Sequence, residues 1–356
     1  MDSWKKLYLF PYWVASVFTT AKSYRNNPVI GSPLLNRMGL HVLRVVLAHA
    51  LYRFRLLLLS PLVPAEDRRQ FLQQGYIVKP DFLPADQFAA LRREIEHYRG
   101  PIRQIVEGDT LTERLFLTEQ VRRALPECER LVNHRPLDRL MRYVGSKNRP
   151  PFFYVENTRQ HTDPSRGPDP QKDCHMDTFH PCAKGWIYLD AVSERNGPYV
   201  FVPGSHRLSW QRLKWEYRES LRASADKRHG GPRYWDGSCR VSSEDLAVMG
   251  YPEPLRLSVA PNTLVVANVR GFHCRGNAVE PGTRLSIWMQ ARDNPFNPLI
   301  TPLPRTTANL FERVWERVLR DQDKRLADQG IRRTREGGFG DPQPAPAQTR
   351  PTQSLP

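Results

Sequence analysis

The chain has 356 residues, of which 40% are hydrophobic and 25% charged, values typical of a globular protein with a full core. The formal net charge of +16 predicts an anionic partner: nucleic acid, a membrane surface or an acidic substrate. Because the sequence has no zinc knuckle, helix-turn-helix signature or regular arginine–aromatic repeat, nucleic acid is not expected. Five cysteines without a CxxC pair argue against a disulfide framework, so we expect a cytoplasmic protein.

The first region, residues 1–63, is apolar and basic, and we expect it to be helical. Residues 39–63 are long enough to span a bilayer, but Arg44, Arg53 and Arg55 would each cost about 2.5–3.5 kcal/mol near its centre. Two interpretations remain. The helix lies on the inner face of a membrane with its arginines toward anionic headgroups, or it packs on the protein's own core with its arginines reaching outward.

Residues 64–300 predict the main domain, in which helices precede a run of short strands. The stretch 66–98 is interpreted as helix, strand, turn and helix, and 101–148 as mostly helical. From residue 150 onward, short apolar runs such as "GWIYLDAV" and "RLSIWMQAR" alternate with Gly, Pro and Asn turns. This alternation is typical of a β sandwich or barrel.

Three further segments interrupt or follow the strands. Residues 207–253 are rich in charged and aromatic residues and predict a helical insertion. The insertion is either a solvated helix with buried aromatic side chains or a lid over an anionic substrate. Residues 301–329 predict an amphipathic helix, and the Pro/Gly-rich tail 330–356 is expected to be disordered.

The stretch "CHMDTFHPC", residues 174–182, is crowded with potential metal ligands. His175 and Asp177 are two residues apart, so in a strand both side chains point to one face. A third ligand is needed, and the candidate is His273 in "NVRGFHCRGN". Two histidines and one carboxylate leave three positions open on an octahedral ion, which suits Fe(II) oxygenase chemistry. Mainly structural roles are expected for the other candidates nearby: Cys174, His180, Cys182, His206 and Cys274.

A cation is needed if the metal is to hold a 2-oxo acid with a distal carboxylate. Arg284 follows His273 by eleven residues, and a hairpin through "GNAVEPG" would return its strand to the metal. A guanidinium can bind a carboxylate through two parallel hydrogen bonds.

Together these motifs resemble the phytanoyl-CoA dioxygenase-like family of Fe(II)/2-oxoglutarate oxygenases, over roughly residues 68–295. The parts that carry the resemblance are "FLQQGYIVKPDFL", "HMD", "NGPYVFVPGSHR", and the later histidine and arginine. The resemblance implies a mainly β fold with flanking helices, built on a double-stranded β-helix of the jelly-roll or cupin-like kind.

The resemblance also implies roles for particular residues. His175, Asp177 and His273 would bind Fe(II), with 2-oxoglutarate and O2 as cosubstrates. Arg284 would hold the distal carboxylate of 2-oxoglutarate, and Trp186 stands where the family has a tryptophan near the cosubstrate. Arg275 departs from the pattern, because a small hydroxyl residue often stands two residues after the distal histidine.

The implied function is a 2-oxoglutarate-dependent dioxygenase that hydroxylates an unactivated C–H bond. The basic charge and the apolar N-terminal region favour an anionic, lipid-like or lipid-linked small molecule as substrate, with peripheral association with a membrane. A soluble natural-product intermediate or an acyl-CoA is the alternative substrate. The alternative function is a catalytically inactive barrel that acts as a membrane-associated binding or scaffold protein.

Overall fold

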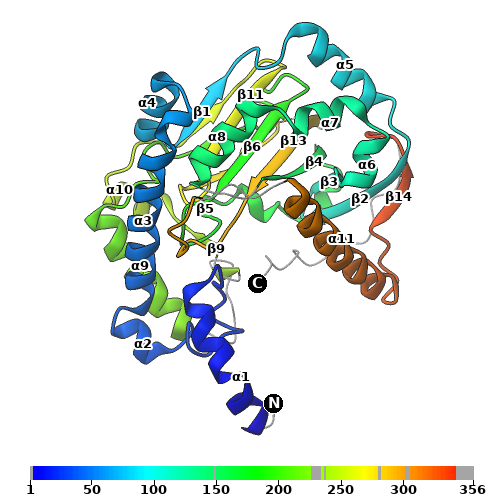
Figure 1. Cartoon of the computed structure of the whole chain (residues 1–356). Coiled ribbons are helices and arrows are strands. Elements are labelled where there is room, and N and C mark those ends of the chain that lie inside the picture. Colours follow the sequence, from blue (N-terminus) through cyan, green and yellow to red (C-terminus); the bar gives the residue numbers. More distant parts are fainter. Residues whose placement is uncertain are drawn as a thin grey trace.

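Two antiparallel sheets face each other and form a double-stranded β-helix, which confirms the expected fold (Figure 1). The computed structural model describes residues 3–146, 150–225, 234–235, 238–279, 282–300 and 305–341. The larger sheet has eight strands in the order β1-β11-β6-β13-β4-β3-β2-β14, and the smaller has six in the order β10-β7-β12-β5-β9-β8.

The strands of the larger sheet are β1 (Tyr76–Lys79), β2 (Gly100–Glu107), β3 (Thr110–Phe116), β4 (Phe152–Gln160), β6 (Ala183–Tyr188), β11 (Thr263–Asn268), β13 (Gly282–Ala291) and β14 (Thr334–Gly337). Those of the smaller sheet are β5 (His175–Met176), β7 (Tyr199–Phe201), β8 (Tyr234–Trp235), β9 (Ser238–Arg240), β10 (Leu255–Leu257) and β12 (His273–Arg275).

Strand alternation divides the side chains of the larger sheet between two cores. On β13, Ile287 and Met289 join the core that helices cover, whereas Trp288 joins an aromatic core between the two sheets. On β6, Ile187 lies on the helix side and Trp186 between the sheets. A residue's parity along a strand therefore decides whether it can reach the interior of the barrel.

Helices cover the outer faces of both sheets (Figure 1). The larger sheet is covered by α3 (Leu40–Leu59), α4 (Ala65–Gln74), α5 (Ala85–Glu96), α6 (Glu119–Arg123), α7 (Pro126–Val132) and α8 (Arg135–Gly145). The smaller sheet is covered by α9 (Trp210–Ala225) and α10 (Ser243–Val248). The remaining helices are α1 (Ser3–Ala15), α2 (Pro33–Arg37) and α11 (Arg305–Ala327).

The prediction that 101–148 is mostly helical is wrong in its first part. β2 and β3 form a hairpin in which Arg103 pairs with Arg114 and Glu107 with Thr110. The turn needs a glycine, because Gly108 has a φ of +54° and a Cβ there would lie 2.5 Å from the backbone of Pro168. Helices begin only at α6.

The insertion 207–253 is helical over α9 and α10, as predicted, but it also contributes to the smaller sheet. Strand β9 pairs with β5, with Arg240 opposite His175. Residues 226–233 and 236–237 lie outside the described residues. The segment therefore builds the wall next to a predicted metal ligand.

The prediction that the tail is disordered from residue 330 onward is wrong for the part that ends at Asp341. β14 extends the larger sheet by pairing with β2, and the Arg335 guanidinium forms an ion pair with the buried Glu113 carboxylate at 2.5 Å. A composition rich in Gly and Pro does not reveal that one buried carboxylate provides a partner for the tail. Residues 342–356, the rest of that predicted segment, lie outside the described residues.

The N-terminal region contains the expected long helix, α3, but its arginines do not point outward. Arg44 donates to the carbonyls of Val17, Thr19 and Ala21, and its side chain is buried. The Arg55 side chain is also buried, and it donates to the carbonyls of Ser146, Pro295 and Asn297. Both interpretations of this helix placed the two arginines outside, and both are wrong on that point. Within the described residues, no helix is long and apolar enough to cross a membrane.

Candidate metal centre

The structure brings the three predicted ligands to one point between the sheets. His175 begins β5, His273 begins β12, and the two lie opposite each other in the antiparallel pair. Asp177 directly follows β5, and its Oδ1 lies 3.6 Å from His175 Nε2 and 3.7 Å from His273 Nε2. All ligand atoms lie within 4.8 Å of one another, close enough for one ion to reach all three.

Backbone carbonyls fix the tautomer of both histidines. His175 Nδ1 lies 2.7 Å from the carbonyl of Asp173, and His273 Nδ1 lies 2.9 Å from that of Gly271. Since a carbonyl can only accept, each Nδ1 carries the proton and each Nε2 presents its lone pair to the centre. Burial lowers the pKa of His175 to about 4, so this imidazole is neutral at physiological pH, as a ligand must be.

Lys184 is a site residue that the sequence reasoning missed. It lies on β6, and its Nζ is 2.6 Å from Asp177 Oδ2. Burial alone would raise the pKa of Asp177, but Lys184 and the two histidines lower it well below its usual value. Asp177 thus presents one oxygen to the histidines and the other to Lys184. The clue was parity, because Lys184 is two residues from Trp186 and shares its face.

A second basic residue reaches the centre from the N-terminal region. Lys22 Nζ donates to the backbone carbonyl of Asp177 at 2.5 Å. Burial is the main cause that lowers the pKa of Lys22 to about 7. The segment between α1 and α2 is therefore part of the wall of the metal centre.

Arg284, the predicted carboxylate anchor, also lies in the barrel. One of its Nη atoms donates to the carbonyl of Gly197, while its Nε is buried without a hydrogen-bond partner among the described residues. Thr158 faces Arg284 across β4 and β13, and its Oγ1 is similarly unpartnered, as is the buried hydroxyl of Tyr199. The rings of Trp186 and Tyr199 lie 4.5 Å apart. Unpartnered buried polar groups cost free energy, so this set fits a polar cosubstrate.

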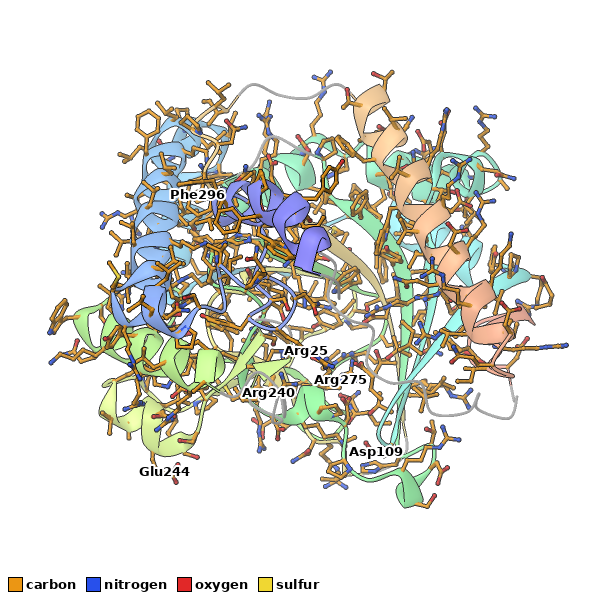
Figure 2. All side chains as sticks on the ribbon, turned by 90° about the horizontal axis from the view of Figure 1, so that it is seen from below. Arg25, Asp109, Arg240, Glu244, Arg275 and Phe296 are labelled. Carbon is orange, nitrogen blue, oxygen red and sulfur yellow. The ribbon has the colours of Figure 1, made fainter. Side chains whose placement is uncertain are left out.

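Arg275, which departs from the family pattern, already has an ion-pair partner. Its guanidinium lies 2.5 Å from the Asp169 carboxylate, and both side chains are largely buried. Figure 2 shows Arg275 among the side chains inside the molecule, whereas Glu244 lies at its edge. The ion pair neutralises Arg275, whereas Arg284 keeps an Nε without a hydrogen-bond partner among the described residues.

The block "NGPYVFVPGSH" supports the site from several sides. Gly197 has a φ of +76°, and a Cβ there would meet the Gln160 amide at 1.7 Å, so only glycine places its carbonyl against Arg284. Ser205 Oγ accepts from the N–H of Phe272, directly before His273, at 2.8 Å. The motif thus holds both the arginine and the distal histidine.

The other potential ligands have structural surroundings, as expected. His206 packs on Phe71 with the rings 5.4 Å apart, and His180 and Cys182 are buried outside the ligand cluster. Cys174 and Cys274 hydrogen-bond each other, and this contact raises the pKa of Cys174. None of the five joins the three-ligand cluster found among the described residues.

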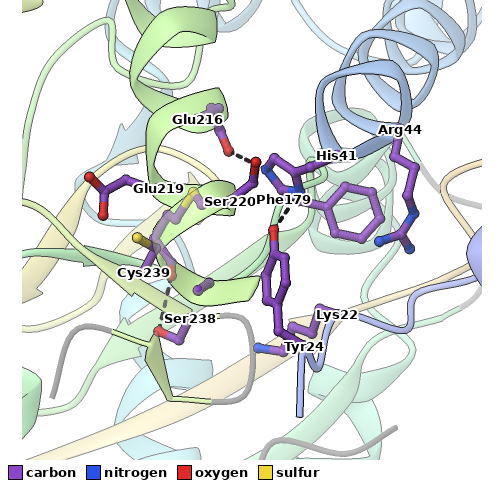
Figure 3. Close-up of a pocket in the computed structure, with 12 residues that line it drawn as sticks. Lys22, Tyr24, His41, Arg44, Phe179, Glu216, Glu219, Ser220, Ser238 and Cys239 are labelled. Carbon is purple, nitrogen blue, oxygen red and sulfur yellow. Dashed lines mark hydrogen bonds and ion pairs between the residues drawn. The ribbon is translucent and has the colours of Figure 1, made fainter. Parts of the chain in front are cut away.

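Helix α9 is not a lid over the metal centre. Its Trp215 packs with Met176 and Phe272 on the outer face of the smaller sheet, opposite to the face of the ligands. A pocket beside it is lined by α9, α3 and the N-terminal segment (Figure 3). There the buried Glu216 carboxylate accepts from His41, 2.8 Å away, and pairs with the Arg212 and Arg270 guanidinium groups at 3.1 and 3.0 Å: three contacts that bind separate elements together.

Comparison with known proteins defines the class that this site indicates. The family model described as phytanoyl-CoA dioxygenase (PhyH) matches residues 71–234, which contain His175, Asp177 and the block that supports the site. His273 and Arg284 lie beyond the matched segment. The match confirms the resemblance stated from the motifs: the chain contains a domain of the phytanoyl-CoA dioxygenase family, and the protein is a 2-oxoglutarate-dependent oxygenase.

Three solved structures of similar fold are distantly related to the chain. The epimerase SnoN in complex with Fe3+, alpha ketoglutarate and nogalamycin RO is 17% identical, with a TM-score of 0.42. The aligned part covers 63% of this chain and 81% of the SnoN chain. HygX from Streptomyces hygroscopicus with nickel and 2-oxoglutarate is 18% identical, with a TM-score of 0.40, covering 64% and 86%. AviO1 from Streptomyces viridochromogenes Tue57 is 17% identical, with a TM-score of 0.37, covering 68% and 99%. At these values the likeness carries no argument about substrate. No curated protein matches the chain.

Proposed function

We propose that this protein is an Fe(II)- and 2-oxoglutarate-dependent hydroxylase of an anionic, lipid-like small molecule. The observation that carries the proposal is the meeting of two histidines and one carboxylate in one barrel with Arg284, whose Nε has no hydrogen-bond partner among the described residues. Two imidazole nitrogens and one carboxylate oxygen are donors that Fe(II) accepts, and they leave room for a chelating 2-oxo acid and O2.

The roles of the chain's own residues follow from their contacts. His175, Asp177 and His273 would hold the iron, which with 2-oxoglutarate and O2 supplies the oxidation of a C–H bond and releases succinate and CO2. Arg284 would bind the distal carboxylate, with Thr158 and Tyr199 completing its hydrogen bonds. Lys184 would keep Asp177 oriented, since ligating carboxylates depend on such contacts.

The side chains next to the centre support an anionic substrate. Lys184 is partly exposed, and its Nζ lies 5.9 Å from the centre of the Trp288 ring. The Arg114 guanidinium lies against the same ring at 5.1 Å. Arg292, just after β13, has a buried Nε without a partner among the described residues. Because Arg114 is paired with Glu156 and Lys184 with Asp177, the Arg292 donor that lacks a partner in the described part of the chain is what favours a negatively charged group on the substrate.

The same wall supports an apolar body for the substrate. Phe116 stacks on Tyr154 at 4.7 Å, and it meets Phe152 edge-on at 5.7 Å. Phe116 and Phe152 are only half-buried, so their rings continue the wall from Trp288 toward solvent. A molecule with an anionic head and an apolar or aromatic body would contact both parts. An acyl-CoA and a soluble natural-product intermediate with these features are outcomes that the following experiment separates.

The test of the function is iron-dependent formation of succinate. The purified chain, loaded anaerobically with Fe(II) and given 2-oxoglutarate and O2, is expected to produce succinate, and His273→Ala should lower both bound iron and succinate at least about 100-fold. The exposed His97, changed to alanine, is the matched control and should leave both unchanged. A wild-type chain that binds no stoichiometric iron and makes no succinate would favour the scaffold function and refute the proposal.

The substrate class has its own test. Lipid and metabolite extracts of a deletion strain should accumulate a species lacking one oxygen atom, and the loaded enzyme should convert it in vitro. An accumulating species that is soluble, or that is an acyl-CoA, would replace the lipid-like assignment while leaving the hydroxylase function intact.

A further inference from the structure

The outer face of α3 is apolar, although it points away from the protein. Six of its large hydrophobic residues are exposed, and Leu43 and Leu57 have 64% and 73% of their surface accessible. They recur at helical spacing along one side of the helix: Leu43, Val46, Leu47, Phe54, Leu57 and Leu58. We call these six residues the α3 stripe.

The distribution of polar and apolar residues on α3 differs from that of a helix exposed to water. Arg44, Arg55 and His41 point into the protein, where they bond to carbonyls and to Glu216. A surface helix in water has its polar residues outside and its apolar residues on the core. Here polar residues share the buried face with Leu56 and Leu59, and six large apolar residues lie on the exposed face, so the exposed face of α3 is suited to an apolar environment.

Neighbouring helices add further exposed apolar side chains. On α2 and the residue that ends it, Leu34 and Met38 are exposed, and α2 packs against α3. On α1, three aromatic residues are exposed: Tyr8, Phe10 and Tyr12. Figure 1 shows that the N-terminal end of α1 projects away from the two sheets. Tyrosine is favoured at the boundary between water and lipid, and phenylalanine on the apolar face of helices that lie there.

The net charge of this region indicates the sign of its partner's charge. Residues 1–64 contain eight Lys or Arg residues and a single acidic residue, Asp2. Of the basic residues, Arg25, Arg37 and Arg53 are exposed, and Arg53 lies next to Phe54 of the stripe. Two copies of the chain meeting through this region would bring like charges together. A flat partner with an apolar interior and an anionic surface matches both the stripe and the arginines.

We propose that the α3 stripe, with α1 and α2, docks on the surface of an anionic lipid bilayer. α3 lies parallel to the membrane, its leucines and Phe54 enter the acyl boundary, and Arg25, Arg37 and Arg53 contact lipid phosphates. The orientation differs from a helix that presents Arg44 and Arg55 to the headgroups, because these two remain bound inside the protein. The proposal does not depend on the oxygenase activity.

The test is flotation of the full chain with vesicles of phosphatidylcholine alone or mixed with phosphatidylglycerol. The wild type should float with the mixed vesicles, and Leu43→Glu combined with Leu57→Glu should lower the bound fraction about tenfold or more. The matched control is Val248→Glu combined with Leu310→Glu, which changes two equally exposed apolar residues on α10 and α11. This control should float like the wild type.

A second pair of variants separates the electrostatic contribution. Arg37→Gln combined with Arg53→Gln should reduce binding to the mixed vesicles and make it less sensitive to salt. Circular dichroism and unchanged succinate formation establish that each variant is folded. The proposal fails if the wild type does not float, or if both double glutamate variants lose binding equally. It also fails if light scattering shows a dimer in the absence of lipid that only the change in the α3 stripe dissociates, since a second copy would then cover this face.

Discussion

The metal centre and α3 both contain buried polar residues, yet the orientation of these residues is set by different physical causes. At the metal centre, β5 and β12 fix where each side chain points, and His175 and Asp177 share a face because they are two residues apart. On α3, Arg44 and Arg55 turn inward because segments outside this helix, around Val17 and around Pro295, offer carbonyls that accept their hydrogen bonds. Backbone periodicity determines the first arrangement, and tertiary hydrogen bonds determine the second.

Glu216 joins the two regions, so its removal tests whether they are energetically coupled. The carboxylate contacts His41 of α3 and Arg270, three residues before the ligand His273. Glu216→Gln leaves buried arginines without their counter-charge and should lower the free energy of unfolding by about 3–5 kcal/mol. Chemical denaturation measures this loss, and iron affinity should fall with it. Glu253→Gln, at an exposed position, is the control and should lie within about 0.5 kcal/mol of the wild type.

The pH dependence of this contribution follows from the pKa of Glu216. Burial alone would raise it, but Arg212, His41 and Arg270 together lower the pKa to about 2. A carboxyl group with a pKa below its unfolded value of about 4.3 stabilises the fold at higher pH, and the stabilisation is lost as pH falls from about 4 toward 2. The difference in stability between wild type and Glu216→Gln should therefore shrink over that range. A difference that stays constant down to pH 2 would show that packing, not charge, is lost in the variant.

A substitution of Arg284 tests how side chains are arranged at the metal centre. Arg284→Lys keeps a positive charge but loses the fork that can hold a carboxylate through two bonds, so the KM for 2-oxoglutarate should rise roughly 10–100-fold. Iron affinity should change little, because Arg284 is not among the clustered ligands. Equal KM values for the two forms would assign the carboxylate to another cation, with Arg292 as the first candidate.

The sequence predicts those parts of the molecule where a local pattern decides the outcome. The barrel, the three clustered residues and the placement of Arg284 inside the barrel follow from strand parity and from the family motifs. Lys184 was missed because its importance arises from a contact between β6 and the end of β5. The tail was misassigned because its pairing with β2 depends on Glu113, more than 200 residues away in the sequence.

The smallest effect is expected when two arginines of α3, Arg44 and Arg53, are replaced and the variants are compared. If Arg44 and Arg53 both faced outward, Arg44→Gln and Arg53→Gln would have the same small effect on stability. In the structure Arg44 donates to carbonyls of the segment that follows α1, whereas Arg53 is exposed. Burial lowers the pKa of Arg44 to about 10, so it stays charged at physiological pH and its hydrogen bonds remain charge-assisted.

Arg44→Gln should therefore destabilise the protein by about 1 kcal/mol, since the glutamine amide can still reach one of the carbonyls while the others lose their donor. Arg53→Gln should change the stability by less than about 0.5 kcal/mol. Hydrogen exchange locates the effect: faster exchange should be confined to residues 16–24 in Arg44→Gln and absent from Arg53→Gln. Because this segment also carries Lys22 to the Asp177 carbonyl, the same variant should loosen that contact. Equal exchange in the two variants would mean that the inward hydrogen bonds of Arg44 do not hold the N-terminal segment in place.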